Sequence, residues 1–196
     1  MNENASHLLL PDGIEEDIIR GMYLYESLGE AEAPRVRLLG SGTILKQVIE
    51  AAHLLTRHFE IRGEIYSVAS FSELARHAQT IDRTRRLAGD AEKSQITKYL
   101  NGCDPIVCAV DYVRAVPAHI NPYLSAPFRI LGTNGFGRSA NRRALRDFLE
   151  VSRAHIAFAS ITSVIHPGLL PHESREQAIE AFAIETSAST PALSNQ

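Results

Sequence analysis

Residues 130–150 limit the possible folds of this chain more than any other stretch. Apolar residues run into a cluster of glycines and then into a charged segment with helical spacing, which predicts a strand, a tight turn and a helix. Gly132, Gly135 and Gly137 permit positive φ or close approach of the backbone, and Ser139 is a candidate N-cap. The unpaired N–H groups of such a turn leave three interpretations open: an ordinary strand-to-helix connection, a turn that docks a partner, and a phosphate site.

The same alternation of strand and helix recurs along the chain. The predicted strands are the short apolar runs at residues 36–39, 64–69, 105–110 and 128–131. Helical spacing follows the first two of them, and the third is apolar without interruption, which is typical of a strand buried on both faces. Strands joined by helical crossovers predict a three-layer α/β/α sandwich around a mostly parallel sheet of four to five strands.

The remaining segments are assigned from their spacing and charge. Residues 14–28 carry apolar side chains at helical spacing and are expected to form a helix. Residues 82–93 are charged and weakly patterned, so we expect a solvent-exposed loop, with a docking patch as the alternative. Residues 154–165 are expected to form a buried helix, and residues 173–184 a final helix.

Length and charge narrow the class of protein. A chain of 196 residues favours one domain, expected over residues 14–186, with an extended lead-in at 1–13 and a disordered tail at 187–196. The formal charge of −3 provides no basic surface for nucleic acid or for an anionic membrane. Because the sequence shows neither an apolar run of about 20 residues nor a signal-peptide layout, a cytoplasmic location is expected.

Residues with catalytic or metal-binding chemistry are sparse. Cys103 and Cys108 are the only cysteines, which argues against a disulfide framework and a zinc cluster, and Cys108 is expected to be buried. A Gly-Ser-Gly turn after the first predicted strand resembles a dinucleotide-binding fingerprint, but Leu45 occupies the place of its third glycine. His53 and His58 point in different directions on one predicted helix, so they are not expected to share a metal ion. We therefore predict no catalytic, cofactor-binding or metal-binding residue.

Five segments, in the same order, resemble one protein family. They are residues 1–4, 39–45, 67–75, 111–117 and 132–139, the last of which reads Gly-Thr-Asn-Gly-Phe-Gly-Arg-Ser. Together they are similar to the C-terminal domain of the homodimeric pyruvate dehydrogenase decarboxylase component, the thiamine-diphosphate-dependent first enzyme of its complex. Transketolases share a related domain, so the resemblance implies a transketolase C-terminal-like fold.

The resemblance also implies partners and site residues. In this family the C-terminal domain supports the dimer and the architecture around the active site, so a homodimer and contact with the remaining decarboxylase domains are expected. A dihydrolipoyl acetyltransferase component, whose lipoyl group the family enzyme acetylates, is a further expected partner. The structural or interface residues implied by the matching motifs are Asp111, Tyr112, Gly132, Asn134, Gly135, Phe136, Gly137, Arg138 and Ser139.

Charges of both signs surround the glycine-rich turn and the helix predicted after it. Such a mixture suits a symmetric contact between two copies of one surface, although a solvated helix face is the simpler alternative. The charged residues are Arg138, Arg142, Arg143, Arg146, Asp147 and Glu150.

The cofactors implied by the resemblance, thiamine diphosphate and Mg²⁺, belong to the full-length family enzyme. Their site uses a Gly-Asp-Gly motif followed by an asparagine, and a glutamate that activates the pyrimidine ring. We find neither in this sequence, so the chain alone is expected to be inactive. Asn134 stands where the family usually has Asp, and Ala140 where the pyruvate dehydrogenase branch usually has an acidic residue. Residues 82–93 also lack the family's usual aromatic residue and proline.

Two functions stay open. In the first, the chain is the C-terminal part of a decarboxylase component that decarboxylates pyruvate with thiamine diphosphate and acetylates the lipoyl group of its partner enzyme. In the second, it is a free-standing, non-catalytic interaction module that retains the fold.

Overall fold

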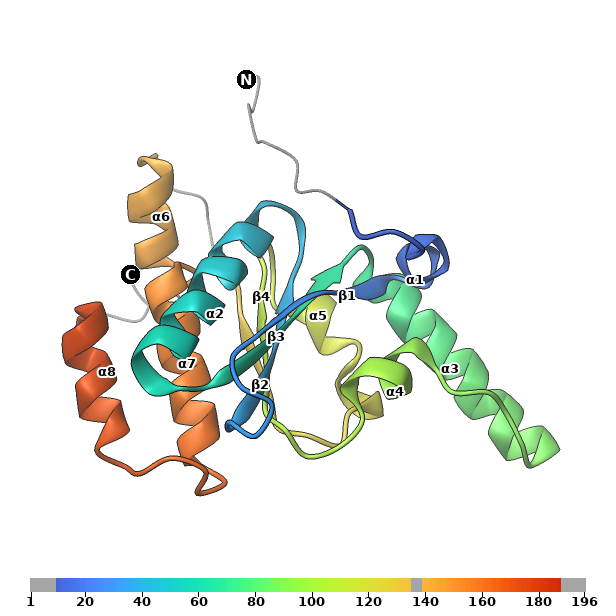
Figure 1. Ribbon diagram of the computed structural model, residues 1–196. Coiled ribbons are helices and arrows are strands. Elements are labelled where there is room, and N and C mark those ends of the chain that lie inside the picture. The colour runs from blue at the N-terminus through green and yellow to red at the C-terminus, as the bar shows by residue number, and fades with distance from the viewer. Residues whose placement is uncertain (1–9, 135–138, 188–196) are drawn as a thin grey trace.

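A five-stranded sheet lies at the centre of the computed structural model, which describes residues 10–134 and 139–187 (Figure 1). The strand order is β1-β3-β2-β4-β5. All neighbouring pairs are parallel except β1 with β3. The strands are β1 (Met22–Leu28), β2 (Arg35–Gly40), β3 (Arg62–Val68), β4 (Ile106–Ala109) and β5 (Phe128–Leu131). The predicted mostly parallel sheet is confirmed, with an antiparallel edge strand added.

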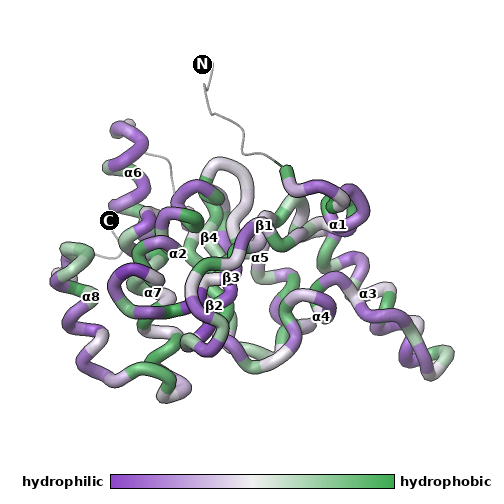
Figure 2. Tube along the Cα trace, in the orientation of Figure 1, coloured by the Kyte–Doolittle hydropathy of each residue, from purple (hydrophilic) through white to green (hydrophobic). Residues whose placement is uncertain are grey.

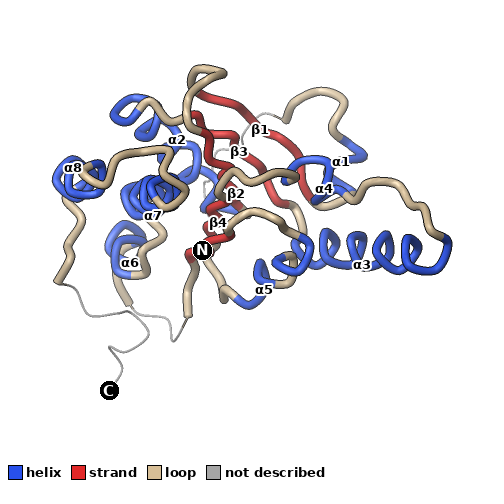
Figure 3. The backbone as a smooth tube through the Cα atoms, turned by 90° about the horizontal axis from the view of Figure 1, so that it is seen from below, coloured by secondary structure: helices blue, strands red, loops and turns tan. Residues whose placement is uncertain are grey.

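Helices cover both faces of the sheet, which gives the three predicted layers (Figure 3). One face packs against α2 (Leu45–Phe59) and α7 (Arg153–Ile165), with α8 (Ser174–Phe182) outside α7. The other face packs against α3 (Phe71–Ala88), α4 (Gln95–Leu100) and α5 (Ala115–Ala118). The remaining helical pieces are α1 (Glu15–Ile19), η1 (Gly42–Ile44), η2 (Asn121–Tyr123) and α6 (Arg142–Phe148).

Alternating side chains on the central strands form two separate apolar clusters. Val107 and Ala109 of β4 join the cluster beneath α2 and α7, whereas Ile106 and Cys108 join the one beneath α3 and α4. All four side chains are at most 1% exposed, as a strand buried on both faces requires. The prediction of a doubly buried strand is therefore confirmed.

Helix α3 begins where the sequence indicates. The Ser70 side chain accepts a hydrogen bond from the Glu73 amide at 3.1 Å, which satisfies one of the free N–H groups of the first turn. Phe71 and Leu74 then face the sheet and are buried. The cap fixes the direction in which the helix leaves β3.

The helix predicted over residues 14–28 is wrong. Only Glu15–Ile19 is helical, and Met22–Leu28 is the strand β1. Gly21 separates the two elements with a φ of 98°, a conformation that L side chains rarely adopt. Pairing with β3 then stabilises an extended backbone, although the apolar residues have helical spacing.

A polar cluster attaches α1 to α4. Asp17 accepts hydrogen bonds from Gln95 at 2.9 Å, from Lys98 at 2.7 Å and from the Tyr99 hydroxyl. Burial raises the pKa of Asp17, but these three donors outweigh burial, so the net effect is a lowered pKa. The carboxylate is 15% exposed and therefore joins elements far apart in the sequence largely out of water.

The loop predicted over residues 82–93 is also partly wrong. Helix α3 continues through Ala88, and its last buried residue is Ile81. Residues 82–88 are therefore helical and fully on the surface. The prediction that these side chains are solvent-exposed is correct, whereas the loop begins only at Gly89.

The span Arg142–Ile165 is long and apolar enough, by length and composition, to cross a membrane. It is not one straight helix, because α6 ends at Phe148, Glu150 has a φ of 57° and α7 begins at Arg153. Ile156 and Ile161 of α7 are 0% exposed within the core of the fold. The apolar character of this span is explained by the predicted buried helix.

Candidate functional site

Three of the matching sequence segments meet at one edge of the sheet. They follow β2, β4 and β5, which are parallel strands whose carboxyl ends lie side by side. Working loops of parallel α/β sheets occupy this position. We call residues 41–44, 111–114 and 132–134 the signature edge.

Hydrogen bonds join the three loops of the signature edge. The Thr43 hydroxyl donates to Asp111 Oδ2 at 3.0 Å, which links the β2 loop to the β4 loop. The Thr133 amide donates to the Tyr112 carbonyl at 3.0 Å, and the Arg114 amide donates to Asn134 Oδ1 at 3.2 Å. The predicted residues Asp111, Tyr112 and Asn134 are therefore brought together, and their bonds are made to one another's loops.

Gly132 is a glycine because the chain is crowded there. A Cβ atom would lie 2.9 Å from the Tyr112 carbonyl oxygen and equally close to side-chain atoms of Arg114 and Val110. Of the two reasons for glycine considered above, close backbone approach applies here. The residue thus allows the β5 loop to lie directly on the β4 loop.

The rest of the predicted turn is only partly described. Gly135, Phe136, Gly137 and Arg138 lie outside the described residues. The prediction that Ser139 caps the following helix is wrong. The N-cap of α6 is Asn141, whose side chain accepts a hydrogen bond from the Ala144 amide at 2.9 Å. The strand-to-helix connection is therefore longer than the glycine pattern indicated.

Burial shifts the pKa of two titratable groups near the signature edge. Burial raises the pKa of Tyr112, and a hydrogen bond with Ser41 opposes that shift in part. Burial also raises the pKa of the Cys108 thiol, which is fully enclosed behind the edge and therefore stays protonated and inert. The described part of the edge is held by hydrogen bonds, and the thiol behind it is not activated.

The residues of the signature edge do not fit thiamine diphosphate with Mg²⁺. A protein holds magnesium diphosphate through one or two carboxylates beside the phosphates themselves, and Asp111 is the single carboxylate of the signature edge. The carboxylate of Asp111 accepts from Thr43, and within residues 10–134 and 139–187 no group of three His, Cys, Asp or Glu could hold a metal ion. Two shallow hollows of about 170 and 180 Å³ lie elsewhere, beside α1 and α4 and between β5 and the end of α7.

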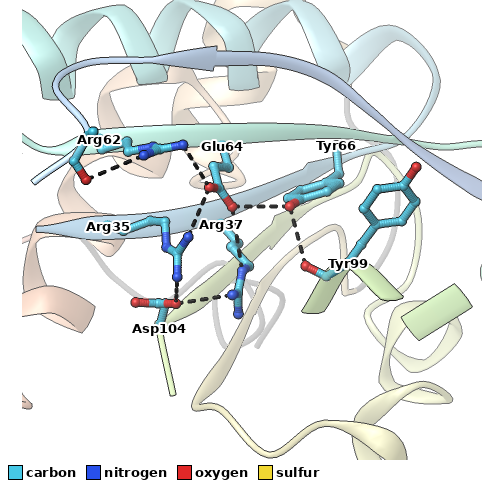
Figure 4. Close-up of polar contacts among 8 residues, drawn as sticks. Arg35, Arg37, Arg62, Glu64, Tyr66, Tyr99 and Asp104 are labelled. Carbon is cyan, nitrogen blue, oxygen red and sulfur yellow. Dashed lines mark hydrogen bonds and ion pairs between the residues drawn. The ribbon is translucent and has the colours of Figure 1, made fainter. Parts of the chain in front are cut away.

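A cluster of charged residues lies at the opposite, amino-terminal ends of the strands (Figure 4). Glu64 of β3 contacts Arg35 at 3.1 Å and Arg62 at 3.3 Å. Asp104, just before β4, contacts Arg35 at 2.5 Å and Arg37 at 3.1 Å. The cluster ties β2, β3 and the loop before β4 together, so its role is to fix the sheet.

Arginines exceed carboxylates in this cluster. The Arg37 side chain is 6% exposed, and its Nε and Nη1 atoms have no hydrogen-bond partner among the described residues. Burial and the neighbouring Glu64 raise the pKa of Tyr66, whose hydroxyl donates to Glu64 at 3.1 Å. Sequence reasoning missed this cluster, although Arg35 and Arg37 alternate within an otherwise apolar strand.

The sheet order, the two helical layers and the signature edge define the class of protein to which this α/β domain belongs. A family model described as "Transketolase-like TK C-terminal domain" matches residues 21–152, and the chain belongs to this family. The solved transketolase from Leishmania mexicana aligns with a TM-score of 0.53 at 18% identity, over 81% of this chain and 21% of that chain. This structural likeness supports the fold.

The individual relatives are more specific. The chain is 35% identical over 195 residues to the pyruvate dehydrogenase E1 component of Cupriavidus necator. This alignment covers 97% of this chain and 22% of the relative. It is 36% identical over 197 residues to the protein of the same name from Pseudomonas aeruginosa, with the same two coverages. The chain thus spans about a fifth of the length of these curated relatives, and it is homologous to their C-terminal region.

Proposed function

We propose that this chain is the C-terminal, architectural part of a pyruvate dehydrogenase decarboxylase component. In this role residues 14–186 form one domain that supports a cytoplasmic homodimer and the decarboxylase domains, while thiamine diphosphate and Mg²⁺ bind to those other domains. The full assembly decarboxylates pyruvate and acetylates the lipoyl group of a dihydrolipoyl acetyltransferase component. The observation that carries the proposal is the signature edge, where three family segments are joined to one another by hydrogen bonds.

The exposed helix that follows the signature edge supports the proposal that another domain or a second copy covers this surface. Helix α6 has seven residues and no buried residue. Helices this short are unstable alone in water and normally depend on packing. Arg143 and Asp147 are both exposed on it, so it offers charges of both signs to the other domains or to a second copy.

A binding measurement tests the assignment of the cofactor to other domains. We expect calorimetric titration of the chain with thiamine diphosphate and Mg²⁺ to give no binding, because the signature edge has a single carboxylate, Asp111, which is hydrogen-bonded to Thr43. A micromolar dissociation constant would contradict this expectation. The same titration of the Cupriavidus necator relative is the positive control.

A reconstitution experiment tests the architectural role. The chain is added to a polypeptide that carries the preceding part of the Cupriavidus necator relative, and release of CO₂ from pyruvate is measured. We expect activity only when both pieces are present. Arg143→Glu on α6 should reduce the activity, whereas Arg57→Glu on the exposed side of α2 should not. Failure of the unaltered chain to restore any activity would favour the second function.

That second function is a free-standing, non-catalytic interaction module. The favouring observation is Asn134, which stands where the family usually has Asp and which accepts a hydrogen bond from the Arg114 amide, so the turn is held without that charge. The DNA upstream of codon 1 discriminates the two functions. An in-frame continuation encoding the glycine-rich diphosphate motif supports the decarboxylase component, and a stop codon without one supports the module.

A further inference from the structure

The charged cluster at the amino-terminal ends of β2 and β3 contains more positive than negative charge (Figure 4). Three guanidinium groups meet two carboxylates there, and the members are Arg35, Arg37, Arg62, Glu64 and Asp104. Figure 2 shows hydrophilic residues among hydrophobic ones in this part of the sheet. Tyr66 adds no charge, because burial and the neighbouring Glu64 raise the pKa of its hydroxyl and keep it protonated. One positive charge of the cluster is therefore left without a negative counterpart.

Arg37 is the arginine of this cluster that depends most on partners within the fold. Its side chain is 6% exposed, compared with 36% for Arg35 and 25% for Arg62. Water hydrates the two more exposed guanidinium groups. A buried charge without full compensation is strongly unfavourable, because the protein interior solvates it poorly. The missing negative charge therefore matters most at Arg37.

The hydrogen bonds of Arg37 are incomplete. Its Nη2 atom lies 3.1 Å from Asp104 Oδ2, an oxygen that also accepts from Arg35. Its Nε atom lies 3.6 Å from Glu64 Oε2, which is too far for a hydrogen bond, and that oxygen accepts from the Tyr66 hydroxyl. Its Nη1 atom is buried and has no partner among the residues that the structure describes. Folded proteins rarely leave a buried donor unpaired, so Nη1 requires a further acceptor.

The loop before β4 leaves space beside this guanidinium group. Apart from its chain neighbours, a Cβ atom on Gly102 would have only two described atoms within 4 Å, Arg37 Nη2 at 3.7 Å and Asp104 Oδ2 at 3.9 Å. The loop therefore passes the guanidinium group without a side chain that covers it. Because Arg37 is almost completely enclosed, this space admits a small ion more readily than a polyatomic one.

We propose that the cluster binds one chloride ion against the guanidinium group of Arg37. The ion accepts a hydrogen bond from Nη1 and balances the single excess charge. A divalent anion would reverse that excess instead of removing it. A buried water molecule also accepts from Nη1, but it leaves the charge uncompensated, so the charge of the cluster favours an anion.

Bromide diffraction tests the location of the site. Crystals of the chain are soaked in sodium bromide, because bromide replaces chloride and gives an anomalous signal. We expect an anomalous peak in contact with Arg37 Nη1. Peaks confined to exposed side chains such as Arg85 would indicate an adventitious ion only and would overturn the proposal.

Thermal unfolding tests binding in solution. Midpoints are measured at constant ionic strength while sodium chloride replaces sodium gluconate, whose anion is too large for the site. A ligand that binds only the folded chain stabilises it, so each tenfold increase in chloride above its dissociation constant should raise the midpoint by about 3–5 °C. A midpoint that is the same in both salts overturns the proposal and leaves water as the acceptor.

Arg37→Met separates this site from general effects of salt. The variant leaves two guanidinium groups with two carboxylates, so it should lose the dependence on chloride. It should also be at least as stable as the unaltered chain in gluconate, because an apolar side chain replaces an uncompensated buried charge. Arg85→Met removes the same charge from an exposed position of α3 and is the matched control, which should keep the full dependence. Equal dependence on chloride in the two variants would contradict the proposal.

Arg35→Met provides the test if Arg37→Met does not fold. Arg35 is more exposed, and its removal also balances the charges of the cluster while Nη1 of Arg37 stays in place. The rise in midpoint should therefore shift to higher chloride concentrations. A rise at unchanged chloride concentrations would show that the excess charge does not hold an anion.

Discussion

Gly132 is the residue at which the signature edge tolerates least change. Gly132→Val is expected to cost about 1–3 kcal/mol, because the new side chain would overlap the Tyr112 carbonyl oxygen, a backbone atom that cannot move away cheaply. Urea unfolding monitored by circular dichroism measures the loss. Ala140→Val, at an exposed position just beyond the turn, is the matched control and should leave the midpoint unchanged.

Two single substitutions test which residue caps α6. Asn141→Ala should cost about 1 kcal/mol because it removes the acceptor of the Ala144 amide, whereas Ser139→Ala should have almost no effect. Equal losses for the two variants in thermal denaturation would contradict the observed cap. Both residues are exposed, so burial does not complicate the comparison.

Individual residues also show what local sequence can and cannot predict. The cap that Ser70 forms with the Glu73 amide can be predicted from the sequence, because both residues lie within one turn of helix. Glu64 and Asp104 were missed because their partner Arg35 is distant in the sequence. The pairing of β2 with β3 brings Glu64 to Arg35, and the pairing of β2 with β4 brings Asp104 there. Alternating charges in an apolar strand are the signal that predicts such a cluster.

At the scale of elements, the errors arise where pairing between distant segments outweighs local spacing. The spacing of Ile14, Ile18 and Met22 fits a helix, yet Gly21 and Gly29 bracket a strand of seven residues. The antiparallel partner of that strand lies beyond three further elements, so its stabilisation has no local signature. Helix α3 was predicted too short for the opposite reason, because its outer half contacts nothing that imposes an apolar pattern.

The attachment of α1 to α4 should make stability depend on pH. An unfolded Asp has a pKa of about 3.9. Because the fold lowers the pKa of Asp17, its contribution is present above that value and is lost as the pH falls through the lower pKa of the folded state. Asp17→Asn should therefore reduce stability at neutral pH and flatten its decline in acid.

Unfolding midpoints at neutral and acidic pH measure both effects of this change. Asp12→Asn is the control, since Asp12 is exposed. A decline in acid that is as steep in Asp17→Asn as in the unaltered chain would show that the attachment does not contribute.

At the scale of the whole molecule, the sequence predicts the class of fold well and the site only in part. The four parallel strands and the helical layers follow from strand-to-helix alternation. The family resemblance selected Asp111, Tyr112 and Asn134, and their loops meet because parallel strands end at a common edge.

The position of β1 in the sequence also affects how the chain folds while it is being translated. Among the strands of this sheet β1 leaves the ribosome first, yet its partner β3 is translated only after the whole of β2 and α2. Until then Met22 and Tyr23, which end almost completely buried, have no surface to cover them. A nascent chain stalled before Val68 would therefore expose an apolar, aggregation-prone segment that chaperones bind.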